Sequence, residues 1–128
     1  MFYEVENEPK KLSLDLLDRA VLFASDFLEL STLDFLNIEF ETLKKYQCGF
    51  CLYDEDEVII TVAKRLSVHE IIVTIFHELI HVNQYVDGRL EQGSKWLGKV
   101  YSCDYDELPW EKEAFEIEQV MMKQFGDF

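Results

Sequence analysis

Two histidines flanking a glutamate form the feature of this sequence with the clearest chemistry. His77, Glu78 and His81 spell the pattern H-E-x-x-H inside an apolar-rich segment. Residues four apart on a helix lie one above the other on the same face, so both imidazoles can bind one tetrahedral metal ion. The carboxylate of Glu78 lies beside them, within reach of a water on that ion. The spacing predicts a zinc site with two histidine ligands and a glutamate that acts as a general base.

The segment around this motif has the signals of an amphipathic helix. Ser67 and Glu70 form a capping box at its start. On a helical wheel, His77 and His81 fall in the polar arc. The opposite arc is apolar and comprises Ile71, Ile72, Ile75, Phe76, Leu79, Ile80 and Val82. Burial of the apolar arc therefore directs the two histidines toward a cleft, whereas the remaining histidine, His69, projects away from His81 and is not expected to be a ligand.

A catalytic zinc site has three protein ligands and one open position, and the histidines of this chain supply only two. The remaining candidates are four glutamates on a helix expected to begin at Pro109, namely Glu111, Glu113, Glu116 and Glu118. Glu116 lies opposite the apolar side of that helix and is expected to be solvated. Glu111 and Glu113 point in nearly opposite directions, so only one of them can face the ion. A solvated face on an acidic helix is the alternative interpretation of all four.

Composition limits the partners of the chain. Its 128 residues, 48% of them hydrophobic, suit one domain over residues 1–128. The 26 acidic residues outnumber the 12 basic ones, and the net charge of -14 repels nucleic-acid phosphates and anionic membranes. Residues 1–11 lack the pattern of a signal peptide, and no apolar stretch has the length of a membrane span. We expect a cytoplasmic protein that binds neither nucleic acid nor membrane.

Three cysteines indicate a reducing compartment rather than a disulfide framework. Cys48 and Cys51 form a C-x-x-C and could, with Cys103, supply three thiolates to a structural zinc. Four ligands are normally needed for such a site, and the sequence has no second C-x-x-C. Small, reduced, partly buried cysteines are therefore the favoured interpretation.

Periodicity elsewhere in the chain predicts an α+β fold. The expected elements are a helix over residues 15–30, a strand over 36–40, a hairpin of 46–53 with 58–63, a loop or cover over about 88–107 with a short turn at Trp96 and Leu97, and a last helix from Pro109. We expect a small, mainly antiparallel sheet of about three strands, packed on the first helix and the motif helix, with the last helix closing the site. The predicted core contains Leu17, Val21, Phe27, Ile38, Phe40, Ile60, Val62, Ile72, Ile75, Phe76, Leu79, Ile80 and Ile117.

From Cys48 to Met122 the sequence resembles the small zincin-like metallopeptidases of gluzincin type, which include the ImmA/IrrE-like, SprT-like and phage-type domains. The segments that carry the resemblance are "TIFHELIHVNQY" and "LPWEKEAFEIE". Reading "EKEA" against the family pattern implies that Glu111 is the third zinc ligand, with Glu113 as the alternative. Many relatives have Asp or Asn four residues after that ligand, to support a zinc-bound histidine, where this chain has Phe115. The resemblance also implies that Val58 to Ala63 is the strand that pairs with extended substrate.

The resemblance implies a zinc-dependent peptidase. Zinc held by the two histidines and Glu111 activates a water, and Glu78 transfers its proton to the leaving amine. Of the tyrosines near the motifs, Tyr85, Tyr101 and Tyr105, we favour Tyr105 as a group that assists catalysis. The acidic surface favours basic or neutral polypeptide substrates, and the absence of a basic patch disfavours the DNA-associated role of SprT-like proteases. The alternatives are hydrolysis of another amide or an ester, and a non-catalytic acidic protein that uses a zincin fold to block or tether a protein partner.

Overall fold

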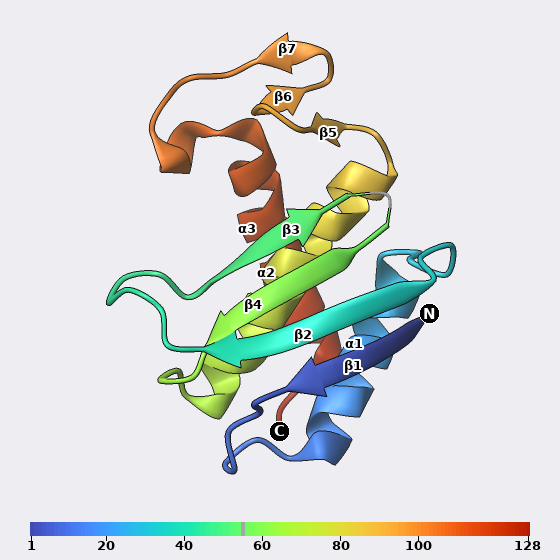
Figure 1. The fold of residues 1–128 in the computed structure, drawn as a ribbon, viewed down its shortest axis with the longest axis vertical. Helices are drawn as coiled ribbons and strands as arrows, with labels where there is room; N and C mark the ends of the chain where they lie inside the picture. The colour runs from blue at the N-terminus through green and yellow to red at the C-terminus, as the bar shows by residue number, and fades with distance from the viewer. Residues whose placement is uncertain (55) are drawn as a thin grey trace.

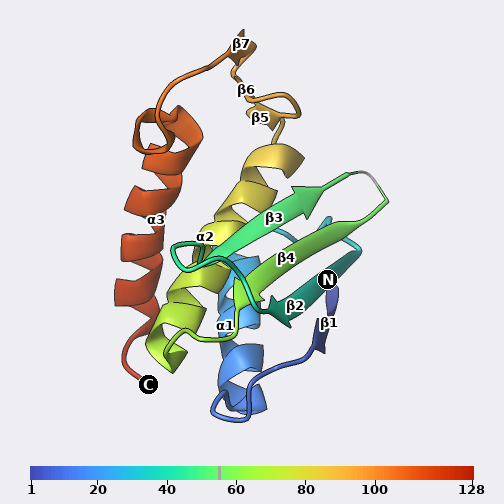
Figure 2. The same cartoon turned by 60° about the vertical axis from the view of Figure 1, so that its left-hand side comes forward.

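A four-stranded sheet with helices on one of its faces forms the larger part of the molecule (Figure 1). The computed structural model describes residues 1–54 and 56–128. The strands lie in the order β1-β2-β4-β3, and their bounds are β1 Phe2–Glu6, β2 Phe35–Glu41, β3 Gly49–Tyr53 and β4 Val58–Ala63. The main helices are α1 Leu14–Phe27, α2 Val68–Val86 and α3 Pro109–Phe125. Seen from the side, α2 lies between the sheet and α3 (Figure 2).

The sheet is mixed, which corrects the prediction of a mainly antiparallel sheet of three strands. β1 pairs with β2, and β2 with β4, in parallel, and only β3 pairs with β4 in antiparallel fashion. The predicted hairpin of β3 and β4 is confirmed, and Glu55 of its turn lies outside the described residues. β4 is the most apolar strand, so a central position removes more apolar surface from water than an edge position would. The larger burial of apolar surface therefore favours the position of β4 between β2 and β3.

Strand β1 was not predicted, because residues 1–11 are polar and acidic. Its side chains alternate: Tyr3 and Val5 are partly buried against the core, whereas Phe2, Glu4 and Glu6 are exposed. Such a strand buries little by itself and depends on β2 for its position. The tertiary pairing, rather than local periodicity, therefore creates it.

The helices begin within one residue of their predicted starts, although α1 ends at Phe27 and not at the predicted residue 30. The Ser13 hydroxyl accepts a hydrogen bond from the Leu16 amide at the start of α1. At the start of α2, Ser67 and Glu70 form both hydrogen bonds of the capping box. Pro109 occupies the first turn of α3, where its lack of an amide hydrogen carries no penalty. These caps determine where the motif helix starts and, with the apolar arc, how it is rotated.

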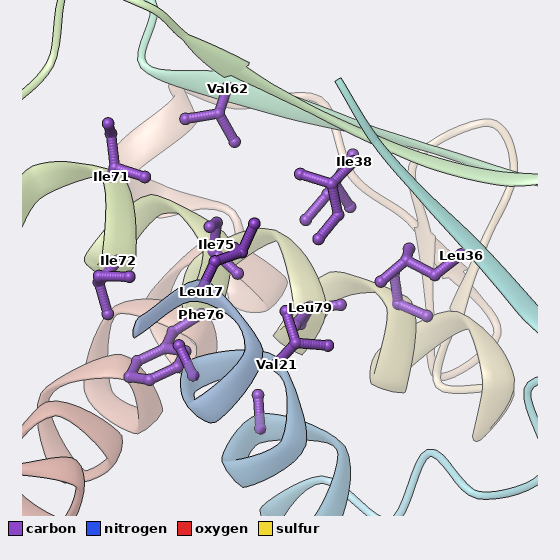
Figure 3. Close-up of a cluster of buried hydrophobic side chains, with 14 of the residues drawn as sticks. Leu17, Val21, Leu36, Ile38, Val62, Ile71, Ile72, Ile75, Phe76 and Leu79 are labelled. Carbon is purple, nitrogen blue, oxygen red and sulfur yellow. The ribbon is translucent and has the colours of Figure 1, made fainter. Parts of the chain in front are cut away.

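The core lies between the sheet and helices α1 and α2 (Figure 3). All predicted core residues are buried except Phe27 and Ile117, which are partly buried and pack against the core. The fully buried set labelled in Figure 3 contains Leu17, Val21, Leu36, Ile38, Val62, Ile71, Ile72, Ile75, Phe76 and Leu79. The apolar arc of α2 is thus buried as predicted, and its polar arc is left facing α3.

Residues between α2 and α3 form a cover with its own small sheet. The sequence predicted a loop or cover with one short turn at Trp96 and Leu97, whereas three two-residue strands pair there in antiparallel fashion: β5 Leu90–Glu91, β6 Lys95–Trp96 and β7 Lys99–Val100. Strands of this length are too short to show a periodicity. A 3₁₀ turn, η1 Tyr105–Glu107, then leads into α3, and Trp96 packs with Leu90 and Trp110 in a second apolar cluster. Among the described residues, no helix combines the length and apolar character of a membrane span.

Candidate metal centre

Three potential metal ligands from two helices converge. His77 and His81 project from the same face of α2, and Glu111 projects from the first turn of α3. The Nε2 atoms of the histidines lie 3.2 Å apart. One oxygen of Glu111 lies 2.9 Å from Nε2 of His77, and the other lies 3.1 Å from Nε2 of His81. Within residues 1–54 and 56–128, this is the one group of three such side chains whose ligand atoms all lie within 4.8 Å of one another.

The spacing of these atoms fits a zinc ion. Tetrahedral zinc holds nitrogen ligands at about 2.0–2.1 Å, which leaves about 3.3 Å between two of them. The 3.2 Å between the two Nε2 atoms is close to that separation. Two imidazoles and one carboxylate are also a common ligand set of catalytic zinc, which keeps its fourth position open.

Hydrogen bonds on the far side of each imidazole direct the Nε2 lone pairs toward Glu111. Nδ1 of His77 lies 2.6 Å from an oxygen of Glu118, and Nδ1 of His81 lies 2.8 Å from the side-chain oxygen of Gln84. Both oxygens accept hydrogen bonds, so each Nδ1 carries the hydrogen of the neutral imidazole and Nε2 keeps a lone pair. Two lone pairs and a carboxylate then face one another, an arrangement that requires a cation, either a metal ion or a proton.

Electrostatics in the cluster favour positive charge. Burial lowers the pKa of His77, but hydrogen bonds to Glu111 and Glu118 outweigh it and raise the pKa to about 10. The pKa of His81 is also raised, because Glu111 outweighs the effect of burial. Burial pushes the pKa of Glu111 upward, yet its hydrogen bonds with the two histidines lower it to about 2. The same field that attracts protons attracts a metal cation.

Glu118 has a different role from the one its spacing suggested. It was one of the four candidates for the third ligand, and it contacts the outer nitrogen of His77 instead. It follows Glu111 by seven residues, which is two helical turns, so both carboxylates face α2. Phe115, four residues after Glu111, is 61% exposed and takes no part in the site. Gln84 was not singled out from the sequence, although its spacing of three from His81 places both on one helix face.

The other candidates lie away from the ligand cluster. Glu113, the alternative third ligand, binds Arg89 and Gln84 and is not a member of the cluster. Glu116 is exposed, as its position on the helix predicted. His69 stacks on Phe128, with ring centroids 5.9 Å apart, and lies outside the cluster as expected. The packing of α3 on α2, which turns Glu111 inward, decides between two glutamates that the sequence left open.

Glu78 lies beside the cluster in a cleft of about 690 Å³. The cleft is also lined by His77, His81 and Glu111, and by residues of β3. Glu78 is only 6% exposed, and burial, opposed by the two histidines, raises its pKa. A carboxylate with a raised pKa holds a proton more readily at neutral pH, which suits a group that exchanges protons with a substrate.

Tyr105 lines the same cleft as Glu111. Partial desolvation of the phenol and the nearby carboxylate of Glu111 raise the pKa of Tyr105, so the phenol is protonated at neutral pH. Tyr85 also lines the cleft, but its ring stacks on Tyr53 at a centroid distance of 5.0 Å. Tyr101 packs against a tryptophan. Of the three tyrosines considered from the sequence, Tyr105 and Tyr85 therefore line the cleft.

Strand β3, rather than β4, is the free edge of the sheet beside the cleft. The sequence assigned substrate pairing to Val58 to Ala63, but β4 is already paired on both sides. Backbone hydrogen bonds to β4 and its turn are made by Cys48 and Asp54, one at each end of β3. In an antiparallel pair every second residue bonds to the neighbouring strand, so the peptide groups of Gly49, Cys51 and Tyr53 point outward. The order of the strands along the sequence could not reveal that β3 is the free edge, because β4 is inserted between β2 and β3.

The start of β3 lies unusually close to its neighbours. A Cβ atom at Gly49 would lie 2.5 Å from the carbonyl oxygen of Thr61 and 2.8 Å from Cγ2 of Thr74. Only glycine allows this approach without a shift of backbone. Gly49 thereby lets the edge strand lie directly over α2, where it forms one wall of the cleft.

The cysteines are free thiols. Cys48 and Cys103 are exposed, and Cys51 lies in the cleft wall. None belongs to the ligand cluster described above. The prediction of partly buried cysteines therefore holds for Cys51 and is wrong for Cys48 and Cys103.

The sequence matches no protein-family model, and a search of curated proteins finds no significant match.

Proposed function

We propose that this protein is a zinc-dependent metallopeptidase with a zincin-like fold. One observation carries the proposal: His77, His81 and Glu111 converge within a cleft that the buried carboxylate of Glu78 also lines. Ligands alone would suit a structural metal. A cleft with room for a peptide, and a carboxylate beside the ligands, are features of catalytic sites.

His77, His81 and Glu111 would hold the zinc, and Glu118 and Gln84 keep the two imidazoles oriented. Bound zinc supplies a Lewis acid that polarises a carbonyl and makes water nucleophilic near neutral pH. Glu78 accepts a proton from the attacking water as the new carbon–oxygen bond forms. It then donates that proton to the amine nitrogen as the carbon–nitrogen bond breaks.

Tyr105 is the proposed donor to the developing oxyanion. Its phenol is protonated at neutral pH, since its pKa is raised above an ordinary value that already lies well above 7, and it lines the cleft together with the potential ligands. Because the side chain is 62% exposed, substrate can reach it from the open side of the cleft. A donor aimed at the charge that forms in the transition state typically accelerates such a reaction by about 10²–10³.

The substrate we propose is an extended polypeptide that pairs with β3. Gly49 and Cys51 turn their peptide N–H and C=O groups outward along the cleft, as β-strand addition requires. The net charge of -14 favours basic or neutral chains over acidic ones through long-range attraction. We further propose that the enzyme works in the cytoplasm, where its free cysteines would stay reduced.

Zinc content is the first test. The purified wild-type protein and His81→Ala are dialysed and analysed for metal, and we expect about one zinc per wild-type chain and little in the variant. A peptide library then tests for cleavage, with Glu78→Gln as the control that keeps the metal and loses turnover. A folded wild type that takes up no zinc contradicts the proposal. Zinc binding without cleavage would favour the alternative, a non-catalytic acidic protein that binds a protein partner.

A further inference from the structure

The side-chain amide of Gln84 contacts the outer ring nitrogen of His81. Its oxygen lies 2.8 Å from Nδ1 of His81. If the amide were reversed, its NH₂ group would face Nδ1, the ring hydrogen would move to Nε2, and that nitrogen could no longer bind zinc. Glu118 cannot change the tautomer of His77 in this way, because both oxygens of its carboxylate accept hydrogen bonds. The orientation of one amide is therefore critical to the site.

Two acceptors hold the Gln84 amide in the productive orientation. Its nitrogen lies 3.0 Å from the carbonyl oxygen of Trp110 and 3.2 Å from a carboxylate oxygen of Glu113. Gln84 is fully buried, so no water is available to compensate a reversed amide. Reversal would set its oxygen against two acceptors and leave buried polar groups unsatisfied.

Arg89 holds Glu113 in place. One Nη of its guanidinium donates to the same Glu113 oxygen, and the other donates to the Asn83 side chain at 2.8 Å. Its Nε donates to Asp87 at 2.7 Å, and the guanidinium lies over the Trp96 ring, 5.3 Å from the centroid. With all these groups engaged, the arginine has little freedom to release the carboxylate. The contacts join the cover, through Trp96, to the neighbourhood of the ligands.

We propose that Glu113, held by Arg89, is a positioning residue that keeps the Gln84 amide oriented so that His81 offers Nε2 to the metal. The inference rests on the zinc site of the proposed function, and it is independent of whether the protein hydrolyses peptides. Sequence spacing offered Glu113 as a ligand. Its contacts instead place it two hydrogen bonds from the ligand His81, as the partner of the amide that contacts that ligand.

Zinc affinity of the full chain tests this role, measured with zinc alone in competition with a chromogenic chelator. Glu113→Leu removes one of the two acceptors that orient the amide, and we expect affinity to fall by about tenfold, at the lower end of effects seen for outer partners of metal ligands. Glu116→Leu is the matched control, since it makes the same change at an exposed site on the same helix. It is expected to leave affinity unchanged.

A pair of exchanges separates amide orientation from a general stabilising effect. Gln84→Glu sets two carboxylates against each other and is expected to weaken zinc binding. Adding Glu113→Gln supplies an amide donor to the new carboxylate and keeps an acceptor for Arg89, so the double variant should regain most of the lost affinity. It also restores the wild-type net charge. A role limited to stabilising the cover through the ion pair of Arg89 predicts no such recovery.

The outcomes are distinguishable. If the wild type binds zinc and Glu113→Leu, shown to be folded by circular dichroism, binds it equally well, the positioning role is wrong and the metal site stands. If Glu113→Leu does not fold, the exchange pair decides: a double variant no better than Gln84→Glu overturns the role. A folded wild type without zinc affinity overturns both this inference and the proposed function.

Discussion

Removing the outer partner of His77 tests the metal centre most directly. An oxygen of Glu118 lies 2.6 Å from Nδ1 of His77, and the two side chains are only 10% and 16% exposed. Glu118→Leu keeps a side chain of similar size but leaves Nδ1 without an acceptor. Glu118→Gln keeps an acceptor oxygen and removes only the negative charge. Zinc affinity should therefore fall in both variants, and further in the leucine variant.

The magnitude follows from the geometry. A short, largely buried hydrogen bond to a charged group contributes about 1.5–3 kcal/mol. Each 1.4 kcal/mol corresponds to a factor of about ten in affinity, so the loss in Glu118→Leu should be between about ten and one hundredfold. Glu118→Gln retains a neutral hydrogen bond, and its loss should be about tenfold or less.

Competition with a chromogenic chelator measures these affinities, and circular dichroism checks the fold of each variant. Glu116→Gln, on the exposed side of the same helix, removes the same charge without touching the cluster and should bind zinc like the wild type. If the wild type binds zinc and Glu118→Leu binds it with equal affinity, Glu118 does not support the ligand and the reasoning from the short contact is refuted.

Three further predictions concern the cleft. Gly49→Ala would place a methyl group 2.5 Å from the Thr61 carbonyl oxygen. Overpacking of this kind should lower the free energy of unfolding by about 1–3 kcal/mol, measured by urea titration. Unchanged stability would mean that β3 can shift to make room for the methyl group. Burial and the carboxylate of Glu78 raise the pKa of the Cys51 thiol, so iodoacetamide should alkylate Cys51 more slowly than the two exposed cysteines. Mass spectrometry measures the three rates, and equal rates would contradict the prediction. Tyr105→Phe removes the proposed oxyanion donor, and peptide hydrolysis should slow by at least about tenfold while zinc affinity changes little; full activity would exclude that role.

Local signals explain why the motif helix could be predicted closely. The capping box at Ser67 and Glu70, the apolar arc and the spacing of His77 and His81 are all properties of one segment. An isolated helix already contains this information, because its period decides which side chains share a face. The pairing of the two histidines and the burial of their opposite face are therefore present in the sequence.

Contacts between distant segments explain what could not be predicted. β1 exists only through its pairing with β2, and the parallel pairing of β2 with β4 arises because β4 is inserted between β2 and β3. No local period encodes a strand's neighbour, since that choice depends on the total apolar surface that each arrangement buries. For this reason the free edge beside the cleft was assigned to the wrong strand of a correctly predicted hairpin.

The sequence by itself determined that two histidines and a glutamate lie in the polar arc of one helix, and it predicted an acidic residue of the last helix as the third potential ligand. The tertiary structure alone decided that Glu111 is the glutamate beside the two imidazoles, that Glu118 contacts His77, and that Glu113 pairs with Arg89. The physical reason is that the packing of α3 on α2 determines how α3 is rotated about its own axis. A rotation of α3 about its own axis would exchange these glutamates without changing its apolar period, so only the packed arrangement selects among them.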